Sequence, residues 1–359
     1  MKTRLFLKSF LVVLLTAVMT VSGYSQDKDL RNIIVLATGG TIAGTGASST
    51  GSSYTSGQIR IGEMIDAVPN IQKLANLTGE QTANVGSQDM NVEVWLILAN
   101  RINELLATDS VDGIVITHGT DTQEETAFFL NLVVKSEKPV VMVSAMRPSS
   151  ALSADGPLNL YNGVAVAASS EAKGKGVLVV INDAILSAHS VKKMLTTPVQ
   201  AFMAPEHGQM GTVNFGLVEF FHQPHGIHTI NSEFSIKGVT ELPRVDIIYG
   251  CADMSTDLID IMIKAGAKGI IIAGVGDGNM NKGTLEAAKK ATAKGIHIVR
   301  ASRIPVGCVL IHGEVVDEDY GTVSSDELSP QKARILLMLA LQKDKNMSRE
   351  KLQELLINY

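Results

Sequence analysis

Two short segments of the chain place glycines and hydroxyl side chains directly after apolar runs. The segment Ala37–Gly44 (ATGGTIAG) follows the apolar run 33–36, and the segment His118–Thr122 (HGTDT) follows the apolar run 114–117. A short β-branched run that stops at glycine predicts a buried parallel strand ending in a tight turn. The carboxyl ends of such strands line the binding crevice of open α/β sheets. The threonine hydroxyls of both turns are therefore candidates for chemistry.

The second segment also has a purely structural interpretation. Thr120 and Asp121 suit a helix N-cap, and Glu124 would complete a capping box. A cap explains one of these residues but does not explain two hydroxyl-bearing turns in one sheet. His118 is a rival candidate for a general base. A histidine between a strand and a turn is often packed or hydrogen bonded to the backbone, and we favour that interpretation.

Other kinds of chemistry lack their sequence patterns. The chain has no Gly-x-Gly-x-x-Gly after its first strand, no Gly-Lys-Ser/Thr phosphate loop and no Gly-x-Ser-x-Gly elbow, which argues against a dehydrogenase in particular. His222, His225 and His228 are spaced three apart, but no carboxylate or cysteine completes a metal site in sequence, so we interpret them as a solvated linker. We expect neither a metal nor a cofactor.

Cysteine usage gives little further information. Cys251 and Cys308 are the two cysteines of the chain. An exported protein can pair two cysteines, but neither residue has an activating base beside it in sequence. We therefore favour a structural role for both.

The strands and helices must place these turns, and their order predicts the fold class. Strands are predicted at 32–37, 112–117, 139–144, 176–181, 245–249, 269–273 and 296–300. Helices are predicted at about 90–106, 122–135, 157–170, 254–266 and 283–294, with a further helix at 330–343. This alternation is typical of an α/β fold with parallel sheets. We expect a larger N-terminal flavodoxin-like or Rossmann-like catalytic domain at 26–221, a linker at 222–243 and a smaller C-terminal α/β domain at 244–359.

The N-terminus has the layout of a secretory signal peptide. Lys2, Arg4 and Lys8 precede an apolar run from Phe10 to Val21, and small residues follow. The apolar run is shorter than the roughly 20 residues that a membrane span needs. We therefore expect residues 1–25 to be cleaved and the protein to be periplasmic or secreted.

Charge and length limit the possible partners of the mature chain. The 359-residue chain has a net charge of −5, and removal of the three basic residues in 1–25 brings it near −8. No basic cluster remains to contact phosphates, so we expect no nucleic acid partner. We also expect no membrane partner after removal of the signal.

A long irregular loop follows the first glycine turn. Residues 44–57 are rich in glycine and serine, and Tyr54 is their one aromatic residue. A loop of this length at the carboxyl end of a strand is usually a lid or a disordered linker.

Several motifs together resemble those of the bacterial type II (periplasmic) L-asparaginases and glutaminase-asparaginases. They extend over essentially the whole expected mature chain, at 37–44, 86–90 (GSQDM), 116–122, 142–148 (MVSAMRP), 154–157 (ADGP), 300–303 (RASR) and 328–334 (LSPQKAR). The resemblance implies hydrolysis of the side-chain amide of L-asparagine to L-aspartate and ammonia, often with some L-glutaminase activity. It also implies a homotetramer.

The resemblance also implies catalytic roles for individual residues. Thr41 matches the nucleophile and Tyr54 the lid tyrosine, while Thr120 and Lys193 match the second catalytic hydroxyl and its lysine. Asp121 matches a carboxylate that pairs with the substrate α-amino group. An acyl-enzyme splits the hydrolysis of a poor electrophile into two easier steps. Tyrosine is ordinarily a poor base at neutral pH, so Lys193 beside Thr120 is the better-motivated proton acceptor, and the base for Thr41 stays open.

Further residues match substrate-binding positions of the family. Ser87 and Gln88 match residues that hold the α-carboxylate and α-amino groups of the substrate. The turns at Gly40 and Gly119 are expected to supply backbone N–H groups to the developing oxyanion.

Two residues of the C-terminal half match positions that reach the active site of an adjacent subunit. Glu314 matches a glutamate that contacts the lid tyrosine. Asp253 stands where many members of the family carry asparagine, and we expect it to alter the preference between asparagine and glutamine.

One alternative comes from a different functional class. A periplasmic amino-acid-binding protein shares the two-domain α/β architecture and the signal peptide. It needs clamps for carboxylate and ammonium groups but no nucleophile. The combination of Thr41 and Thr120 with Lys193 therefore discriminates between the two hypotheses.

Overall fold

The computed structural model describes residues 30–51 and 53–359. The expected signal peptide, residues 1–25, lies outside the described residues. Residues 31–359 form one compact unit, which contains two separate, mainly parallel sheets. None of the helices in the described part of the chain is long and apolar enough to span a bilayer.

The larger sheet has eight strands in the order β10-β9-β6-β5-β4-β3-β1-β2. The five strands from β2 to β5 are parallel, whereas β6, β9 and β10 extend the sheet in antiparallel fashion. The parallel part has the 2-1-3-4-5 order of flavodoxin-like folds. The strands are β1 (Asn32–Gly39), β2 (Asn76–Val85), β3 (Gly113–Thr117), β4 (Val140–Val143), β5 (Val177–Ile181), β6 (Ala184–Ser187), β9 (Gly211–Asn214) and β10 (Leu217–Phe220).

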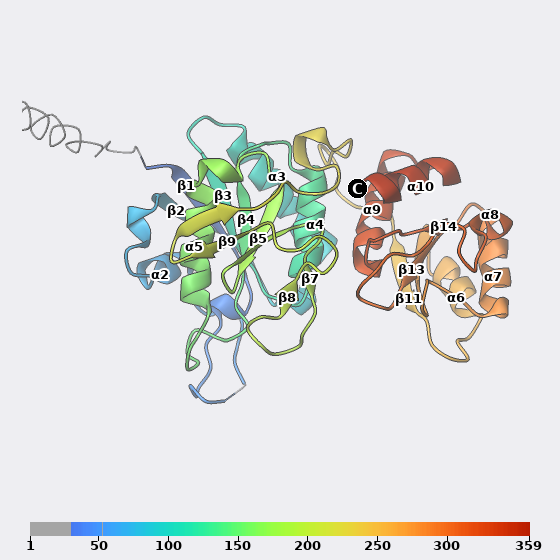
Figure 1. Cartoon of the computed structure of the whole chain (residues 1–359), viewed down its shortest axis with the longest axis horizontal. Helices are drawn as coiled ribbons and strands as arrows, with labels where there is room; N and C mark the ends of the chain where they lie inside the picture. Colours follow the sequence, from blue (N-terminus) through green and yellow to red (C-terminus); the bar gives the residue numbers. More distant parts are fainter. Residues whose placement is uncertain (1–29, 52) are drawn as a thin grey trace, which may run out of the picture. The chain divides into compact units, whose positions relative to one another are not determined.

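Helices cover both faces of this sheet, and Figure 1 shows α4 and α5 on opposite sides of the strands. Successive strand residues point to opposite faces: Ile114 and Ile116 pack in the core with α3 and α4, and Val115 packs in the core with α2 and α5. Burial on both faces explains why these strands read as continuous apolar runs. The helices are α2 (Ile61–Asp66), α3 (Val92–Leu106), α4 (Gln123–Val133) and α5 (Gly156–Ala168).

The smaller sheet has four parallel strands in sequential order, β11 (Val245–Tyr249), β12 (Gly269–Gly274), β13 (His297–Ser302) and β14 (Val323–Ser324). Helix α9 (Pro330–Lys343) contacts β11, β12 and β13 and also packs against α4. One hydrophobic core therefore runs from the larger sheet through α4 and α9 to the smaller sheet. The other helices here are α6 (Leu258–Lys264), α7 (Lys282–Thr292), α8 (Asp317–Tyr320) and α10 (Arg349–Asn358).

Short elements connect these layers. A two-stranded antiparallel ribbon pairs β7 (Lys192–Lys193) with β8 (Phe202–Met203). The 3₁₀ helices are η1 (Thr41–Ala43), η2 (Ile71–Lys73), η3 (Ser87–Asp89), η4 (Ser170–Ala172) and η5 (Thr229–Asn231).

The α/β fold with two parallel-sheet regions of unequal size is confirmed. All seven predicted strands and all six predicted helices are present, with bounds that differ by a few residues. The strands β2, β6, β7, β8, β9, β10 and β14 and the helices α2, α8 and α10 were not predicted. Strand β2 lies at the sheet edge and is partly exposed, so it lacks the continuous apolar run that identified its neighbours.

The structure bears on two further sequence interpretations. Segment 222–243, the expected linker, exposes His222 and His225, but its later part belongs to the fold: Phe234 and Ile236 are fully buried in the main core, and Lys135 Nζ donates to the carbonyl oxygens of Thr229 and Ser232. The two cysteines are free and exposed, so no buried structural role is evident for them.

Candidate active site

The two glycine turns lie side by side at the carboxyl ends of adjacent strands. Strands β1 and β3 pair in register up to Ala37 and Thr117, and in this strand order they flank the switch point where ligands bind. A Cβ atom on Gly40 would lie 2.3 Å from the backbone nitrogen of Gly119. The φ angle of Gly40 is also 82°, which L side chains rarely adopt. Only glycine therefore allows the two turns to approach so closely.

The backbone N–H groups of the turns are not equally available. Gly40 N–H donates to the Val85 carbonyl over 3.2 Å. The sequence predicted that this N–H group binds the oxyanion, but in this conformation it is already engaged. The N–H groups of Gly119 and Thr120 donate to no atom of the described residues. These two groups are therefore free for a ligand, and so is the backbone N–H of Thr41, which also donates to no atom of the described residues.

Thr41 begins the 3₁₀ helix η1 and is buried. Its hydroxyl lies 2.7 Å from the Tyr54 hydroxyl in a hydrogen bond that either group can donate. Tyr54 is 40% exposed, so this contact joins a buried hydroxyl to one that solvent reaches. Thr38, three residues earlier, instead donates to the Thr117 carbonyl over 2.9 Å, which agrees with a structural role.

The loop that carries Tyr54 is held in place by backbone contacts. Thr45 and Thr55 form a two-way antiparallel bridge across its base. The Gly44 carbonyl accepts from both the backbone N–H and the hydroxyl of Ser149, and Gly46 N–H donates to the Ser150 hydroxyl. This anchoring favours a lid over a disordered linker.

A second hydroxyl lies beside a lysine and a carboxylate. Lys193 Nζ donates to Thr120 Oγ1 over 2.9 Å and to Asp121 Oδ1 over 2.7 Å. Helix α4 has Thr122 at its N-cap position, without a side-chain cap. The capping interpretation of Thr120 and Asp121 is therefore wrong, and these side chains face Lys193 instead.

Groups from two distant parts of the chain position Lys193. Glu124 accepts the backbone N–H of Lys193 over 2.6 Å and also accepts the Gln331 side chain from the start of α9. Lys332 is fully buried and donates to the carbonyls of His189 and Val191, immediately before the β7 ribbon. Burial lowers the pKa of Lys332 to about 8. Sequence reasoning considered Glu124 only for a capping box and gave Gln331 and Lys332 no individual role, because no local pattern links positions separated by 69 to 207 residues.

Ser87 connects a third strand end to the same turns. It follows β2 at the start of η3, where its Oγ accepts the backbone N–H of Asp121 over 3.1 Å and its carbonyl accepts the Thr122 hydroxyl. A Cβ atom on Gly119 would lie 2.6 Å from Ser87 Oγ. The neighbouring Gln88 is exposed and contacts Asp89.

His118 is saturated with hydrogen bonds and fully buried. Its Nδ1–H donates to the Gly119 carbonyl over 2.6 Å, and its Nε2 accepts the hydroxyl of Thr126, which itself accepts from Trp95 Nε1. Burial lowers the pKa of His118 to about 4. A neutral ring with both nitrogens engaged is not placed as a base for Thr41, in agreement with the favoured interpretation.

Asp253 and Glu314 do not join this group within one chain. Asp253 is exposed, with φ at 56°, four residues after β11. Glu314 accepts from the Asn279 side chain. No hydrogen bond or ion pair among the described residues links either residue to Thr41, Tyr54, Thr120 or Lys193.

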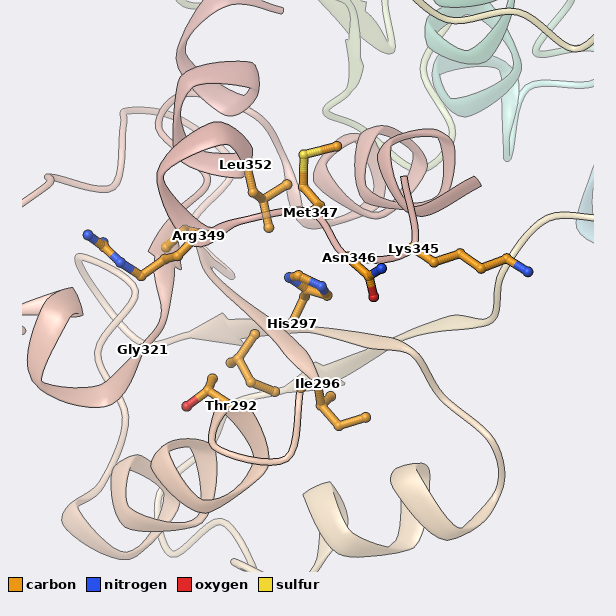
Figure 2. Close-up of a pocket in the computed structure, with 12 residues that line it drawn as sticks. Thr292, Ile296, His297, Gly321, Lys345, Asn346, Met347, Arg349 and Leu352 are labelled. Carbon is orange, nitrogen blue, oxygen red and sulfur yellow. The ribbon is translucent and has the colours of Figure 1, made fainter. Parts of the chain in front are cut away.

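A separate cavity of about 360 Å³ lies beside the smaller sheet and is lined by none of the predicted site residues. Figure 2 shows the His297 side chain in its middle, while the side chains of Lys345 and Arg349 lead away in opposite directions. The cationic groups therefore do not converge on one point. The candidate active site is the group of hydroxyls around the two glycine turns.

Two family models together match most of the chain. The model described as "Asparaginase, N-terminal" matches residues 32–226, and the model described as "Glutaminase/Asparaginase C-terminal domain" matches residues 244–356. The first match contains the candidate active site, and the second contains the smaller sheet.

Relatives and a solved structure agree with these models. The chain is 50% identical over 318 residues to a probable periplasmic L-asparaginase of Haemophilus influenzae, covering 89% of this chain and 90% of that protein. It is 46% identical to a glutaminase-asparaginase of Acinetobacter glutaminasificans, covering 92% and 100%. The crystal structure of a probable cytoplasmic L-asparaginase from Campylobacter jejuni superposes with a TM-score of 0.88 at 46% identity, covering 92% and 100%.

Proposed function

This chain belongs to the asparaginase family of enzymes, and we propose that it hydrolyses the side-chain amide of L-asparagine to L-aspartate and ammonia. We further propose that it does so through a threonine acyl-enzyme, with L-glutamine as a secondary substrate. Relatives described as L-asparaginases and as glutaminase-asparaginases support both substrates.

One observation carries the proposal. Two buried threonine hydroxyls stand at the ends of adjacent strands, Thr41 paired with Tyr54 and Thr120 paired with Lys193, across the contact between Gly40 and Gly119. An amino-acid-binding protein has no use for two such hydroxyls, each joined to a group that can exchange protons.

In the first half of the proposed reaction, Thr41 Oγ1 attacks the amide carbon and its proton passes to the Tyr54 hydroxyl, which lies 2.7 Å away and releases its own proton to solvent through its exposed side. The free N–H groups of Gly119 and Thr120 are the proposed donors to the oxyanion. The carbon–nitrogen bond then breaks, and ammonia leaves after the nitrogen gains one proton. An acyl ester on Thr41 remains.

In the second half, water attacks the ester, the side-chain carboxylic acid of the product forms, and the Thr41 hydroxyl is regenerated. Thr120 accepts a hydrogen bond from Lys193, which leaves its own hydroxyl proton free to be given to a ligand. We propose that Thr120, held by Lys193, gives its proton to the leaving nitrogen in the first half of the reaction. In the second half it takes a proton from the attacking water.

The α-amino and α-carboxylate groups of the substrate need opposite charges or dipoles. Asp121 is 56% exposed at its side chain despite its pairing with Lys193, so one face of the carboxylate stays open to an ammonium group. Ser87 and Gln88 are the proposed partners of the α-carboxylate and α-amino groups. Ser87 Oγ lies directly beside Gly119, which supports the proposed contact of Ser87 with the substrate.

The remaining features of the proposal concern assembly and location. We propose a homotetramer in which Asp253 and Glu314 of one subunit complete the active site of another. We also propose catalytic and C-terminal domains at 26–221 and 244–359, and export after cleavage of residues 1–25. The periplasmic relative supports export.

The decisive experiment measures ammonia release from asparagine and from glutamine by the purified protein. Turnover of asparagine supports the proposal. Tight binding of amino acids without ammonia release from either substrate would instead identify a binding protein.

Substitutions in the first turn test the nucleophile. Thr41→Ala should lower kcat by several orders of magnitude, while Thr38→Val, a matched change three residues away, should leave kcat within about tenfold. Mass spectrometry after rapid acid quenching should detect an acyl adduct on Thr41 in the wild type. Near-normal turnover by Thr41→Ala would remove this residue from the mechanism.

A further inference from the structure

Three histidines and one glutamate from separate parts of the chain converge on one point. His189 follows β6, His207 lies between β8 and β9, His225 lies in the segment after β10, and Glu327 lies shortly before α9. The sequence interpretation found no carboxylate for His225, and this is wrong, because Glu327 lies 3.4 Å from its Nε2. A carboxylate more than 100 residues away in sequence is invisible to a search for local spacing.

The Nε2 atoms of all three histidines face the same carboxylate. The distance from Nε2 to the nearer Glu327 oxygen is 3.3 Å for His189, 2.9 Å for His207 and 3.4 Å for His225. Only the His207 contact is a hydrogen bond within the described residues. The rings of His207 and His225 stack with centroids 4.4 Å apart, so the two imidazoles approach Glu327 as a pair.

These three distances are close to the ligand-to-ligand distances expected between a carboxylate oxygen and three histidine nitrogens in a tetrahedral zinc site. Ligand atoms that each lie about 2.0–2.1 Å from Zn²⁺ are roughly 3.3 Å from one another in a tetrahedron. One ligand atom each from His189, His207 and Glu327 already lies within 4.8 Å of the others. Small side-chain rotations would close this set around an ion.

The innermost histidine is oriented as a ligand. His189 is buried, and its Nδ1 lies 3.3 Å from the Ser190 hydroxyl. When Nδ1–H donates to that hydroxyl, Nε2 presents a lone pair toward Glu327. Metal-bound histidines commonly have such a partner on their other nitrogen. Without a cation between them, a neutral Nε2 and a carboxylate oxygen at 3.3 Å would repel each other.

The surroundings allow an ion to enter and to be balanced. The side chains of His207 and His225 are 28% and 53% exposed, so the cluster opens to solvent on their side. Lys192 is a nearby cation, and it is already paired with Glu206 over 2.6 Å.

We propose that His189, His207 and Glu327 form a site for Zn²⁺, with His225 as the fourth ligand. Imidazole nitrogens with one carboxylate oxygen suit Zn²⁺ rather than Mg²⁺ or Ca²⁺, which prefer oxygen ligands alone. The ion would tie the β6–β9 region to the start of α9, whose Lys332 holds the segment before Lys193. This proposal does not depend on the proposed function.

The test uses the full mature protein without a polyhistidine tag, after dialysis against a chelator. Calorimetric titration with Zn²⁺ should give one site per chain, whereas titration with Mg²⁺ should give none. His207→Gln and Glu327→Gln should each weaken Zn²⁺ binding more than about 100-fold, since loss of an outer-shell partner alone costs 10–100-fold. Zn²⁺ should also raise the Tm of the wild type and not that of the two variants.

His312→Gln is the matched control, because it removes a histidine that contacts a single carboxylate, Glu318, on the surface. It should bind Zn²⁺ as the wild type does. Circular dichroism shows whether each variant folds, and His225→Gln replaces any variant that does not. Absence of a stoichiometric site, or equal binding by the wild type, His207→Gln and Glu327→Gln, would overturn the proposal.

Discussion

Lys193–Asp121 and Arg300–Asp317 are two ion pairs between the same kinds of groups in opposite settings. The side chains of Lys193 and Asp121 are 17% and 56% exposed, whereas those of Arg300 and Asp317 are each 1% exposed. Lys193 holds one hydroxyl and one carboxylate at the end of a crevice. Its carboxylate partner still faces solvent, so a ligand can compete for it.

Arg300 has no such freedom. Two of its nitrogens bind Asp317 over 2.7 Å each, and the guanidinium also donates to the carbonyls of Asp277 and Leu310. Asp317 additionally accepts the Thr322 hydroxyl. Every direction of this pair is occupied by protein. Arg300 belongs to the family motif RASR at 300–303, yet its contacts stabilise the fold. A residue in a family motif can therefore serve the fold and not the active site.

The largest expected effect separates the two pairs by activity. Lys193→Met should lower kcat by about 10²- to 10⁴-fold, equivalent to about 2.7–5.5 kcal/mol, the usual range for losing a proton-transfer group. The free energy of unfolding should change by less than about 1 kcal/mol, because the pair is partly exposed. Steady-state kinetics and urea denaturation measure the two quantities. Lys173→Met, which removes a surface pair with Glu137, is the control and should alter neither.

The reverse result is expected for the buried pair. Arg300→Met leaves the Asp317 carboxylate buried without its cation, and should lower the free energy of unfolding by roughly 3–5 kcal/mol. Adding Asp317→Leu should recover part of this loss, because the uncompensated charge is then gone. Urea denaturation of the single and double variants tests this. A double variant less stable than Arg300→Met would show that the stranded charge is not the cause.

His118 is a buried group that is neutral, unlike the two ion pairs, and its contribution to the free energy of unfolding should depend on pH. The pKa of His118 is about 4 in the folded protein because of burial, below the 6.5 of an unfolded histidine. The unfolded state therefore binds an extra proton as pH falls below 6.5, and stability present above that pH is lost toward pH 4. The loss is about 3 kcal/mol, at about 1.4 kcal/mol per pKa unit.

Comparison with His118→Asn isolates this contribution. The stability advantage of the wild type over the variant, measured by urea denaturation at pH 7, 5.5 and 4, should shrink as the pH falls. The pair of Arg300 with Asp317 remains in both proteins and cancels from the difference. An advantage that stays constant from pH 7 to pH 4 would contradict the buried, neutral state of His118.

The parallel strands and the turns that follow them could be predicted because each has a pattern of neighbouring residues in the sequence. Strands buried on both faces read as apolar runs, and the glycines that end β1 and β3 stand next to the threonines that the turns present. The sequence therefore predicted that Thr41 and Thr120 lie just after the ends of β1 and β3. The family resemblance was needed for Lys193, whose local surroundings beside Lys192 suggest only a surface lysine.

Contacts between distant segments could not be predicted. The two interactions that hold Lys193 in place, through Glu124 and Lys332, join α4, the β7 ribbon and α9. Likewise, Glu327 lies more than 100 residues from His189 and His207 in sequence, and the fold brings the three together. Edge strand β2 was missed for a related reason, because its stability comes from pairing with β1 and not from burial of its own side chains.

The smallest expected effect concerns Asp253, which the sequence resemblance predicts to stand where many members of the family carry asparagine. Its φ of 56° is left-handed, a conformation that asparagine also tolerates, so Asp253→Asn should preserve the fold and test the charge alone. If this exposed side chain completes a neighbouring active site, loss of its charge should change the ratio of kcat/KM for asparagine to that for glutamine by about three- to fivefold, equivalent to less than about 1 kcal/mol.

Steady-state kinetics with both substrates at low ionic strength is the measurement for Asp253→Asn, since salt screens exposed charges. Asp260→Asn, on nearby α6, is the control for a general change in charge. Unchanged kcat/KM values for both substrates would place Asp253 outside the site and leave the open pair, Lys193 with Asp121, as the charge that a substrate meets.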